Sequence, residues 1–347
     1  MLDIILSIST AFLITFLTIP IVISVVKKNE KLLDKPNSDR ASHKISVPTF
    51  GGIAIFCGIL FSIIFWINLA KYTALQPLLS ALLIVFFIGV VDDLISLSPF
   101  KKLVGQLLAI TVVVYFSDLR ITSMYGIFTI HELPYWVSLL LTAFTMVVIT
   151  NAYNLIDGLD GLAASVGIVM TFFFGLLFLI SNELEYVVLS WSLTGALLAF
   201  LRFNFHPAKI FMGDTGSLVI GFLLSVFAVS IVESNIKYEV FDFEAKGSAL
   251  AIAILIVPLF DALRVFVIRV SKGGSPLSPD RNHIHHNLSD LGFGHKRTSL
   301  YICLANLFFI GLVVVLRDFG VNYILLIILL LAIVLSMIPI WLKKRRG

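Results

Sequence analysis

Two amides and two carboxylates occur close together in one short stretch of the chain, between two long apolar segments. These residues are Asn151, Asn154, Asp157 and Asp160. The last three recur at every third position, so a helical stretch would place them on one face. Oxygen ligands of this kind suit a hard cation, and the amides could also donate hydrogen bonds to a ligand. Helix capping accounts for a single such residue but does not explain their density.

Two further acidic clusters lie at the ends of apolar segments. Asp92 and Asp93 end one of these segments, and Asp214 precedes another within a run of small residues. Adjacent carboxylates repel each other unless a cation compensates them, and Lys101 and Lys102 follow nearby. A solvated helix end or an N-cap is the structural alternative. Ionisable groups beside a membrane segment are costly unless they face protein or water, which favours a functional site.

A histidine-rich segment follows the acidic clusters. It contains Arg281, His283, His285 and His286. No cysteine and no HExxH helix accompany the histidines, so a zinc site is the weaker interpretation. Arginine and histidine donate charge-assisted hydrogen bonds to phosphate oxygens, which favours a phosphate-binding loop. Upstream, Asp261 and Arg264 are spaced to pair on one helix, and Pro258 predicts a kink just before them.

The composition is that of a polytopic membrane protein. Hydrophobic residues make up 59% of the chain, charged residues only 13%, and the mean hydropathy is +1.03. Soluble domains carry roughly 25% charged residues. We therefore expect an all-α membrane protein in which residues 1–347 form a single domain without a sequence repeat. Cys57 and Cys303 lie in apolar segments and imply no disulfide framework, and we expect the first segment to be retained rather than cleaved.

Apolar segments of roughly 20 residues can cross the hydrocarbon core of a membrane as helices. On this basis the sequence predicts about eleven transmembrane helices. Their expected ranges are Ile4–Val26, Phe50–Ala70, Leu75–Val91, Leu103–Phe116, Trp136–Thr150, Gly161–Ile180, Tyr186–Leu201, Ser217–Val232, Ser248–Ile268, Leu300–Leu316 and Val321–Leu342.

Lysine and arginine residues predict the orientation of these helices, because cytoplasmic loops carry an excess of them. When the loops are assigned alternately to two faces, most of the 25 basic residues collect on the face of the first loop. The other face receives only Lys71, Arg120, Lys237, Lys246 and Arg317. We therefore expect the N-terminus outside and the C-terminus in the cytoplasm. The three acidic clusters and the histidine-rich segment then lie on the cytoplasmic face, where we expect them to line one cleft.

Carboxylates and amides for a hard cation, with basic residues for phosphate, indicate phosphoryl transfer that uses Mg²⁺, with Mn²⁺ as the alternative ion. A cytoplasmic site in the membrane then calls for a lipid acceptor and a soluble nucleotide donor. The motifs resemble, in order, those of the polyprenyl-phosphate N-acetylhexosamine-1-phosphate transferases. The matching segments are Val91–Leu94, Asn151–Ala163, Phe211–Ser217 and Asp280–His286, with His43–Lys44 and Pro48–Gly52 in the first loop.

The resemblance, which spans nearly the whole chain, implies roles for individual residues. The catalytic residues would be Asp92, Asp93, Asp157 and His283. The substrate-binding residues would be Lys44, Lys102, Asn151, Asp160, Phe211, Arg281, His285 and His286. The metal ligands would be Asn154 and Asp214. Within these sets, Lys102 would contact phosphate, Phe211 would stack on uracil, and Asp160 would hydrogen-bond the same base. Asp157 matches the motif without a single assigned role.

The implied reaction is attack by undecaprenyl phosphate on the β-phosphorus of a UDP-N-acetylhexosamine, with release of UMP. The eleven expected helices and the histidine-rich segment resemble the undecaprenyl-phosphate GlcNAc-1-phosphate transferase branch. The phospho-N-acetylmuramoyl-pentapeptide transferases are the alternative, and UDP-N-acetylhexosamines other than UDP-GlcNAc stay open as donors. The product would initiate cell-envelope polysaccharide synthesis at the bacterial inner membrane.

Two other classes fit less well. CDP-alcohol phosphotransferases need an arginine shortly after their Asp-Gly motif, whereas Asp160-Gly161 is followed by Leu-Ala-Ala-Ser. A secondary transporter would place its polar residues near the middle of the membrane rather than at the cytoplasmic ends of helices. The isoelectric point of about 9.0 comes from basic loops and does not indicate nucleic acid. A homodimer is left open.

Overall fold

The computed structural model describes residues 2–28, 47–234, 246–273 and 282–346, and the named elements within them are all helices. They are α1 (Leu2–Lys27), α2 (Gly51–Trp66), α3 (Leu75–Ile95), α4 (Pro99–Ser117), the short 3₁₀-helix η2 (Ile127–Thr129), α5 (Tyr135–Asn154), α6 (Leu162–Ile180), α7 (Leu184–Asn204), α8 (Gly213–Glu233), α9 (Gly247–Ile254), α10 (Ile256–Ser271), α11 (Ile284–Asp290), α12 (His295–Val315) and α13 (Val321–Arg346).

Nine of the described helices are long and apolar enough to cross a membrane. A tenth span results if the broken pair α9 and α10 is counted as one. The apolar helix α2 has only 16 residues, and it would be the eleventh. These helices support a polytopic membrane protein, as the sequence predicts. The count of eleven spans and the orientation of the termini stay predictions.

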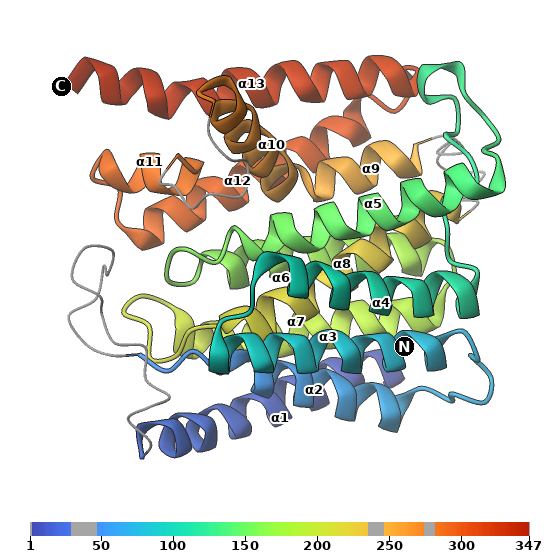
Figure 1. Ribbon diagram of the computed structural model, residues 1–347, viewed down its shortest axis with the longest axis vertical. Helices are drawn as coiled ribbons and strands as arrows, with labels where there is room; N and C mark the ends of the chain where they lie inside the picture. The colour runs from blue at the N-terminus through green and yellow to red at the C-terminus, as the bar shows by residue number, and fades with distance from the viewer. Residues whose placement is uncertain (1, 29–46, 235–245, 274–281, 347) are drawn as a thin grey trace.

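The expected span Ser248–Ile268 is a broken helix rather than a straight one. α9 ends at Ile254 and α10 begins at Ile256, with a bend of 73° between them. Pro258 explains the break, because proline has no N–H to donate to the carbonyl of residue 254 and its ring clashes with that carbonyl. The kink predicted from Pro258 is therefore confirmed, and α10 runs obliquely to the other helices (Figure 1).

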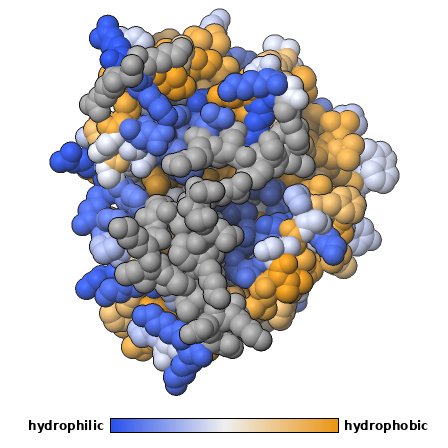
Figure 2. All heavy atoms as spheres, turned by 60° about the vertical axis from the view of Figure 1, so that its left-hand side comes forward, coloured by the Kyte–Doolittle hydropathy of each residue, from blue (hydrophilic) through white to orange (hydrophobic). Residues whose placement is uncertain are grey.

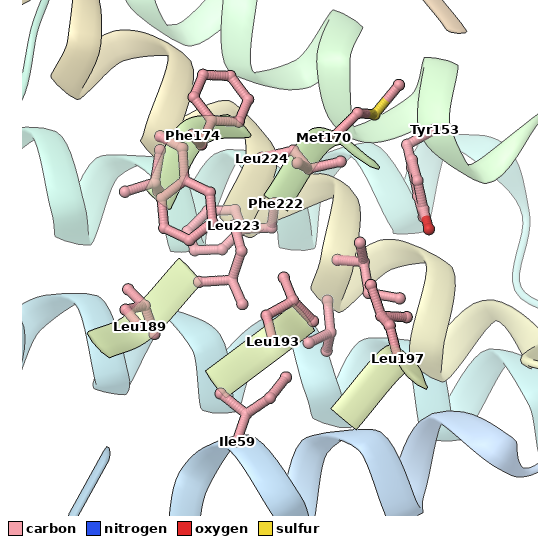
Figure 3. Packing of buried hydrophobic residues seen from close by; sticks show 14 of the residues in the cluster. Ile59, Tyr153, Met170, Phe174, Leu189, Leu193, Leu197, Phe222, Leu223 and Leu224 are labelled. Atoms are coloured by element: carbon pink, nitrogen blue, oxygen red, sulfur yellow. The ribbon is translucent and has the colours of Figure 1, made fainter. Parts of the chain in front are cut away.

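Helix α8 forms the centre of the bundle. In its most apolar stretch 94% of the residues are buried, and α2, α3, α5, α6, α7 and α9 pack around it. Figure 3 shows Phe222, Leu223 and Leu224 of α8 between Met170 and Phe174 of α6 and the leucines of α7. A helix that is apolar on all sides is expected to be buried in this way. Its packing fixes the position of the polar residues in its first turn.

Small residues let α2 approach α8 closely. A Cβ atom added to Gly52 would lie 2.1 Å from the backbone nitrogen of Gly216, so no side chain fits between the two helices. The N–H groups of Gly51 and Gly52 donate to the carbonyls of Phe211 and Met212, both at 2.9 Å. The start of α2 is thereby held against the segment that leads into α8.

Several helices begin or end at one end of the bundle (Figure 1). There α3, α5 and α7 end, α4, α6 and α8 begin, and α11 lies beside them. Figure 2 turns this end toward the viewer and shows hydrophilic residues gathered on it, with hydrophobic residues on the flanks. The fold thus brings polar clusters from distant parts of the sequence to one end of the molecule.

Candidate active site

The N-terminus of α8 is held by a carboxylate from α3. Asp93 Oδ1 accepts a hydrogen bond from the backbone N–H of Asp214 at 2.7 Å. Its Oδ2 accepts bonds from the Thr215 N–H at 3.0 Å and from the Thr215 hydroxyl at 2.6 Å. The first N–H groups of a helix have no partner within that helix, and a capping oxygen satisfies them. Asp93 therefore caps α8 from another helix, while its predicted catalytic role stays a prediction.

Gly213 permits this close approach of α3 to α8. Its φ of +72° lies in the left-handed region, which glycine adopts without strain. A Cβ atom added to Gly213 would lie 2.1 Å from the Thr49 carbonyl oxygen and 2.6 Å from Asp93 Oδ2. Any side chain at this position would displace the capping carboxylate.

Asp214 lies at the centre of the predicted site. Its Oδ1 accepts a hydrogen bond from Asn154 Nδ2 at 2.9 Å and lies 3.4 Å from Lys102 Nζ. The Asn154 Oδ1 in turn accepts a bond from the Ser217 hydroxyl at 3.0 Å. The Asp214 side chain is 31% exposed, which leaves it open to a ligand. The two predicted metal ligands, Asn154 and Asp214, are thus direct neighbours.

Lys102 links Asp214 to the buried carboxylate of Asp92. Its ammonium group forms an ion pair with Asp92 Oδ2, and the Leu97 N–H donates to Asp92 Oδ1 at 2.6 Å. The expectation that a lysine at the start of the next helix compensates the acidic pair is confirmed for Lys102. Because Asp92 is 4% exposed and both its oxygens have partners, its carboxylate is held in one position.

Asn151 forms a two-sided amide contact with Gln106 of α4. Its Nδ2 donates to Gln106 Oε1 at 2.8 Å, and its Oδ1 accepts from Gln106 Nε2 at 3.3 Å. The same Nδ2 also donates to the Val147 carbonyl at 2.8 Å. These bonds fix α4 against α5, and the predicted substrate contact of Asn151 stays a prediction. Gln106 belongs to no motif, so only its position in the fold reveals it.

The polar stretch from Asn154 to Asp160 is not a single helix. α5 ends at Asn154, and residues 155–161 form turns before α6 begins at Leu162. Gly161 has a φ of +75°, which belongs to the left-handed region and interrupts the helical run. A shared helical face for Asn154, Asp157 and Asp160 requires a helix through all three residues, and this condition is therefore not met.

Asp157 lies within these turns, close to several other carboxylates. Removal from water raises the pKa of the Asp157 carboxyl to about 7, and the negative charges of Asp214, Asp93 and Asp160 contribute to the rise. A carboxyl with so perturbed a pKa, held in a polar cluster, is a candidate for a functional residue. This agrees with its place among the predicted catalytic residues, although its role stays a prediction.

The Asp157→Asn substitution should remove a pH dependence of stability. The folded-state pKa of about 7 lies above the ordinary value of 3.8, so the folded state binds more protons between these pH values. Stability should therefore fall by up to about 1.4 kcal/mol per pH unit as pH rises from roughly 4 to 7, and then level off. The variant should lack this slope. Thermal unfolding in detergent with EDTA, from pH 5 to pH 8, measures it, and a pH-independent difference between the proteins would contradict the prediction.

Asp160 is enclosed by two histidines that belong to no motif. Its Oδ2 lies 2.6 Å from His206 Nδ1 and 3.5 Å from His295 Nδ1, and it accepts a bond from the Ala208 N–H at 3.2 Å. The Asp160 side chain is 1% exposed, whereas that of His206 is 42% exposed. The predicted uracil contact of Asp160 stays a prediction, and His206 is the more accessible group. Sequence reasoning missed both histidines because each stands alone in the chain.

Phe211 lies directly before the start of α8. It is half-buried, and its N–H donates to the Pro48 carbonyl at 2.7 Å. This backbone bond ties the predicted base-stacking residue to the segment before α2, while the stacking itself stays a prediction. The predicted substrate-binding residues Lys44 and Arg281 lie outside the described residues.

The three histidines of the predicted phosphate-binding segment differ in their surroundings. His283 and His285 are buried, and His286 is half-buried with its ring centroid 4.3 Å from that of His285. Burial lowers the pKa of His285 to about 3, and the nearby His286 contributes, so His285 is neutral. A Cβ atom added to Gly158 would lie 2.6 Å from His285 Nε2, which places this ring against the turn that carries Asp157.

The acidic cluster has the composition of a site for a divalent cation. Lys102 is the cation seen in direct contact with it among the described residues. Four carboxylates from three different helix ends surround the site: Asp92, Asp93, Asp157 and Asp214. Asn154 donates its amide nitrogen to Asp214, and the neutral oxygen of the same amide, which accepts from the Ser217 hydroxyl, adds a further hard ligand. Hard oxygen ligands with an excess of negative charge fit Mg²⁺, so the residues are compatible with the ion that the sequence predicts.

Comparison with known proteins shows the family of this chain. The family model of glycosyl transferase family 4 matches residues 75–232, which carry α3 to α8. A probable undecaprenyl-phosphate N-acetylglucosaminyl 1-phosphate transferase of Bacillus subtilis is 31% identical over 333 residues, which cover 94% of this chain and 90% of that protein. This chain belongs to glycosyl transferase family 4, and the predicted resemblance is confirmed.

Two further relatives agree with this assignment. The decaprenyl-phosphate N-acetylglucosaminephosphotransferase of Mycobacterium tuberculosis is 36% identical over 289 residues, covering 77% of this chain and 71% of that protein. The undecaprenyl-phosphate alpha-N-acetylglucosaminyl 1-phosphate transferase of Escherichia coli K12 is 28% identical over 316 residues, covering 88% of this chain and 83% of that protein. Both names fit the predicted branch of the family.

Proposed function

We propose that this protein transfers GlcNAc-1-phosphate from UDP-GlcNAc to undecaprenyl phosphate and releases UMP. The observation that carries the proposal is the contact of Asp214, Asn154 and Lys102 at the ends of apolar helices. Relatives in Bacillus subtilis and Escherichia coli are named for undecaprenyl-phosphate N-acetylglucosaminyl 1-phosphate transfer. The mycobacterial relative is named for a decaprenyl phosphate, which supports a polyprenyl phosphate as the acceptor.

In this reaction an oxygen of the lipid phosphate attacks the β-phosphorus of UDP-GlcNAc. A new P–O bond forms while the bond from the β-phosphorus to the oxygen shared with the α-phosphorus breaks. UMP leaves with that oxygen, and GlcNAc remains linked to the lipid through a pyrophosphate. Lys102, held between Asp92 and Asp214, would offer its positive charge to a phosphate oxygen. Asp214 and Asn154 would hold Mg²⁺ or Mn²⁺, which neutralises charge on the transferred group when bound.

The proposal places the site on the cytoplasmic face of the bacterial inner membrane, with the N-terminus outside. Single cysteines test this orientation in a protein that lacks Cys57 and Cys303. Ser98→Cys lies at the end of the molecule that carries the site, and Thr129→Cys lies at the other end, both exposed. An impermeant maleimide should label Thr129→Cys in intact cells and Ser98→Cys only after permeabilisation. Equal labelling of both in intact cells, or the reverse pattern, would contradict the orientation.

Purified protein in detergent tests the reaction directly. With undecaprenyl phosphate and Mg²⁺, UMP release should be fastest from UDP-GlcNAc within a panel of UDP-N-acetylhexosamines, and it should stop without the lipid. Release only from UDP-N-acetylmuramoyl-pentapeptide would instead favour the muramoyl-pentapeptide transferases. Uptake of a solute by vesicles without UMP release from any donor would favour a transporter and refute the proposal.

A further inference from the structure

Asp261 of α10 binds His283 and Ile284 of the histidine-rich segment, which is called the histidine segment below, through both of its oxygens. Its Oδ2 lies 2.9 Å from His283 Nδ1, and its Oδ1 accepts a hydrogen bond from the Ile284 N–H at 2.9 Å. Ile284 is the first residue of α11, so Asp261 caps this short helix from another helix. Asp261 is 4% exposed and His283 is 5% exposed, so little water competes for these bonds.

Arg264 extends the contact by one turn of α10. Its guanidinium group lies 3.3 Å from Asp261 Oδ1 and donates a hydrogen bond to the Asn282 carbonyl. The pairing of Asp261 and Arg264 that the sequence predicts is therefore confirmed. A buried carboxylate requires compensation of this kind. Asp261, His283 and His285 could geometrically surround a metal ion, but the charge of Arg264 opposes a cation there and favours hydrogen bonding instead.

The break between α9 and α10 places Asp261 beside the histidine segment. α9 packs beside α8, and the 73° bend at Leu255 turns α10 away from that path (Figure 1). Asp261 and Arg264 follow within the next turns of α10, where they reach residues 282–284. The bent pair of helices thus serves as a support for the histidine segment.

The same segment contacts the acidic cluster on its other side. His285 lies against Gly158, next to Asp157, and its buried ring leaves no room for a side chain at position 158. A displacement of the histidine segment would therefore change the contact of His285 with the turn between α5 and α6.

We propose that Asp261 is a positioning residue for the UDP-sugar donor, because it fixes His283 and the start of α11 where the histidine segment meets the site. This inference rests on the proposed function. When His283 donates its Nδ1–H to Asp261, its Nε2 is left for a second partner, and the carboxylate sets both the tautomer and the orientation of the ring. Such a residue contributes to donor binding without contacting the acceptor.

Two substitutions separate the parts of this contact. Asp261→Asn keeps an oxygen for the Ile284 N–H but turns an amide NH₂ toward His283, which disfavours the native tautomer. Asp261→Ala removes both bonds. We expect the KM for UDP-GlcNAc to rise roughly 10- to 100-fold, more in the Ala variant, as for the loss of a hydrogen bond to a charged group. The KM for undecaprenyl phosphate should stay within about twofold, because the predicted phosphate contact, Lys102, pairs with Asp92 and Asp214 and not with Asp261 or His283.

Asp290→Asn provides the matched control. Asp290 lies at the other end of α11 and pairs with Lys343 at 2.6 Å, so its loss alters the same helix without touching His283. This variant should leave both KM values unchanged. An unchanged donor KM in both Asp261 variants, or equal rises of the donor and acceptor KM values, would overturn the inference.

A double-mutant cycle with His283→Gln tests whether Asp261 acts through His283. The double variant should be no worse than the more affected single variant, because residues that act as a unit are not additive. Full additivity would overturn the proposal that Asp261 acts through His283.

If the unaltered protein releases no UMP from any UDP-sugar, the proposed function fails, and hydrogen exchange then tests whether Asp261 holds α11. Deuterium uptake in residues 284–290 should rise in Asp261→Ala but not in Asp290→Asn, and unchanged uptake would refute the contact.

Discussion

Asp214→Asn should reduce UMP release to below about 1% of the unaltered rate, in line with the loss of a group that stabilises transition-state charge. Asp214 accepts a bond from Asn154 and lies beside Lys102, so its carboxylate touches both the other predicted metal ligand and the predicted phosphate contact. The substitution keeps the shape of the side chain and removes its charge. The affinity for a divalent ion should therefore fall, and excess Mg²⁺ should restore only part of the activity.

Ser217→Ala is the matched control for this prediction. The Ser217 hydroxyl donates to Asn154 Oδ1, so its removal loosens the predicted amide ligand while leaving Asp214 charged. The effect should be of the order of one hydrogen bond, about fivefold to tenfold. Titration of both variants with Mg²⁺ at saturating donor and acceptor measures the difference. An Asp214→Asn protein with near-normal activity would show that the cation-binding role is assigned to the wrong carboxylate.

Asp92→Asn should leave more activity than Asp214→Asn, and its defect should shrink as pH rises from 6 to 9. A phosphate monoester has a second pKa near 6, so the lipid phosphate is already largely dianionic at neutral pH and needs little help from a base. Asp92 is also engaged by Lys102 and by the Leu97 N–H, which indicates a carboxylate that positions the lysine. A defect that is complete at every pH would instead assign Asp92 an indispensable chemical role.

The sequence predicts which polar residues lie close together, because the membrane topology limits the places where helix ends can lie. Apolar segments predict the helices, and the charge bias predicts that Asp92, Asn154 and Asp214 lie on the same side of the membrane. Adjacent helices in a bundle then leave little freedom in where such ends lie. The observed contacts of Asn154 and Lys102 with Asp214 agree with this expectation. The predicted spans and the predicted cluster both follow from the apolar segments and from the polar residues between them.

The contacts within the cluster were beyond prediction from the sequence. Asp93 and Asp214 are separated by 121 positions, and no local pattern states that one caps the helix of the other. Likewise, the spacing of Asn154, Asp157 and Asp160 suggested a helical face, but the chain turns after Asn154 and passes through the left-handed conformation at Gly161. Periodicity alone does not distinguish a helix from a turn that repeats polar residues at the same interval.

Asp93→Ala should lower activity about 100-fold and raise the Mg²⁺ concentration for half-maximal activity by about tenfold, as removal of a residue that orients a metal ligand typically does. Both oxygens of the Asp93 carboxylate accept hydrogen bonds, from the N–H groups of Asp214 and Thr215 and from the Thr215 hydroxyl. Without it, the first turn of α8 loses its cap, which costs about 0.5–2 kcal/mol of stability. Asp214 would then no longer be held in one orientation toward Asn154.

Thr215→Val separates this positioning effect from chemistry at Asp93. It removes only the hydroxyl bond of 2.6 Å and keeps the carboxylate together with both N–H contacts. If Asp93 positions Asp214, this variant should show a smaller defect of the same kind, with a modest rise in the Mg²⁺ requirement and an unchanged pH profile. If Asp93 is a base, Asp93→Ala should instead lose activity mainly at low pH with an unchanged Mg²⁺ requirement, and Thr215→Val should leave the Mg²⁺ requirement unchanged. Because three bonds aim both oxygens of Asp93 at the start of α8, we expect the Mg²⁺ requirement to change.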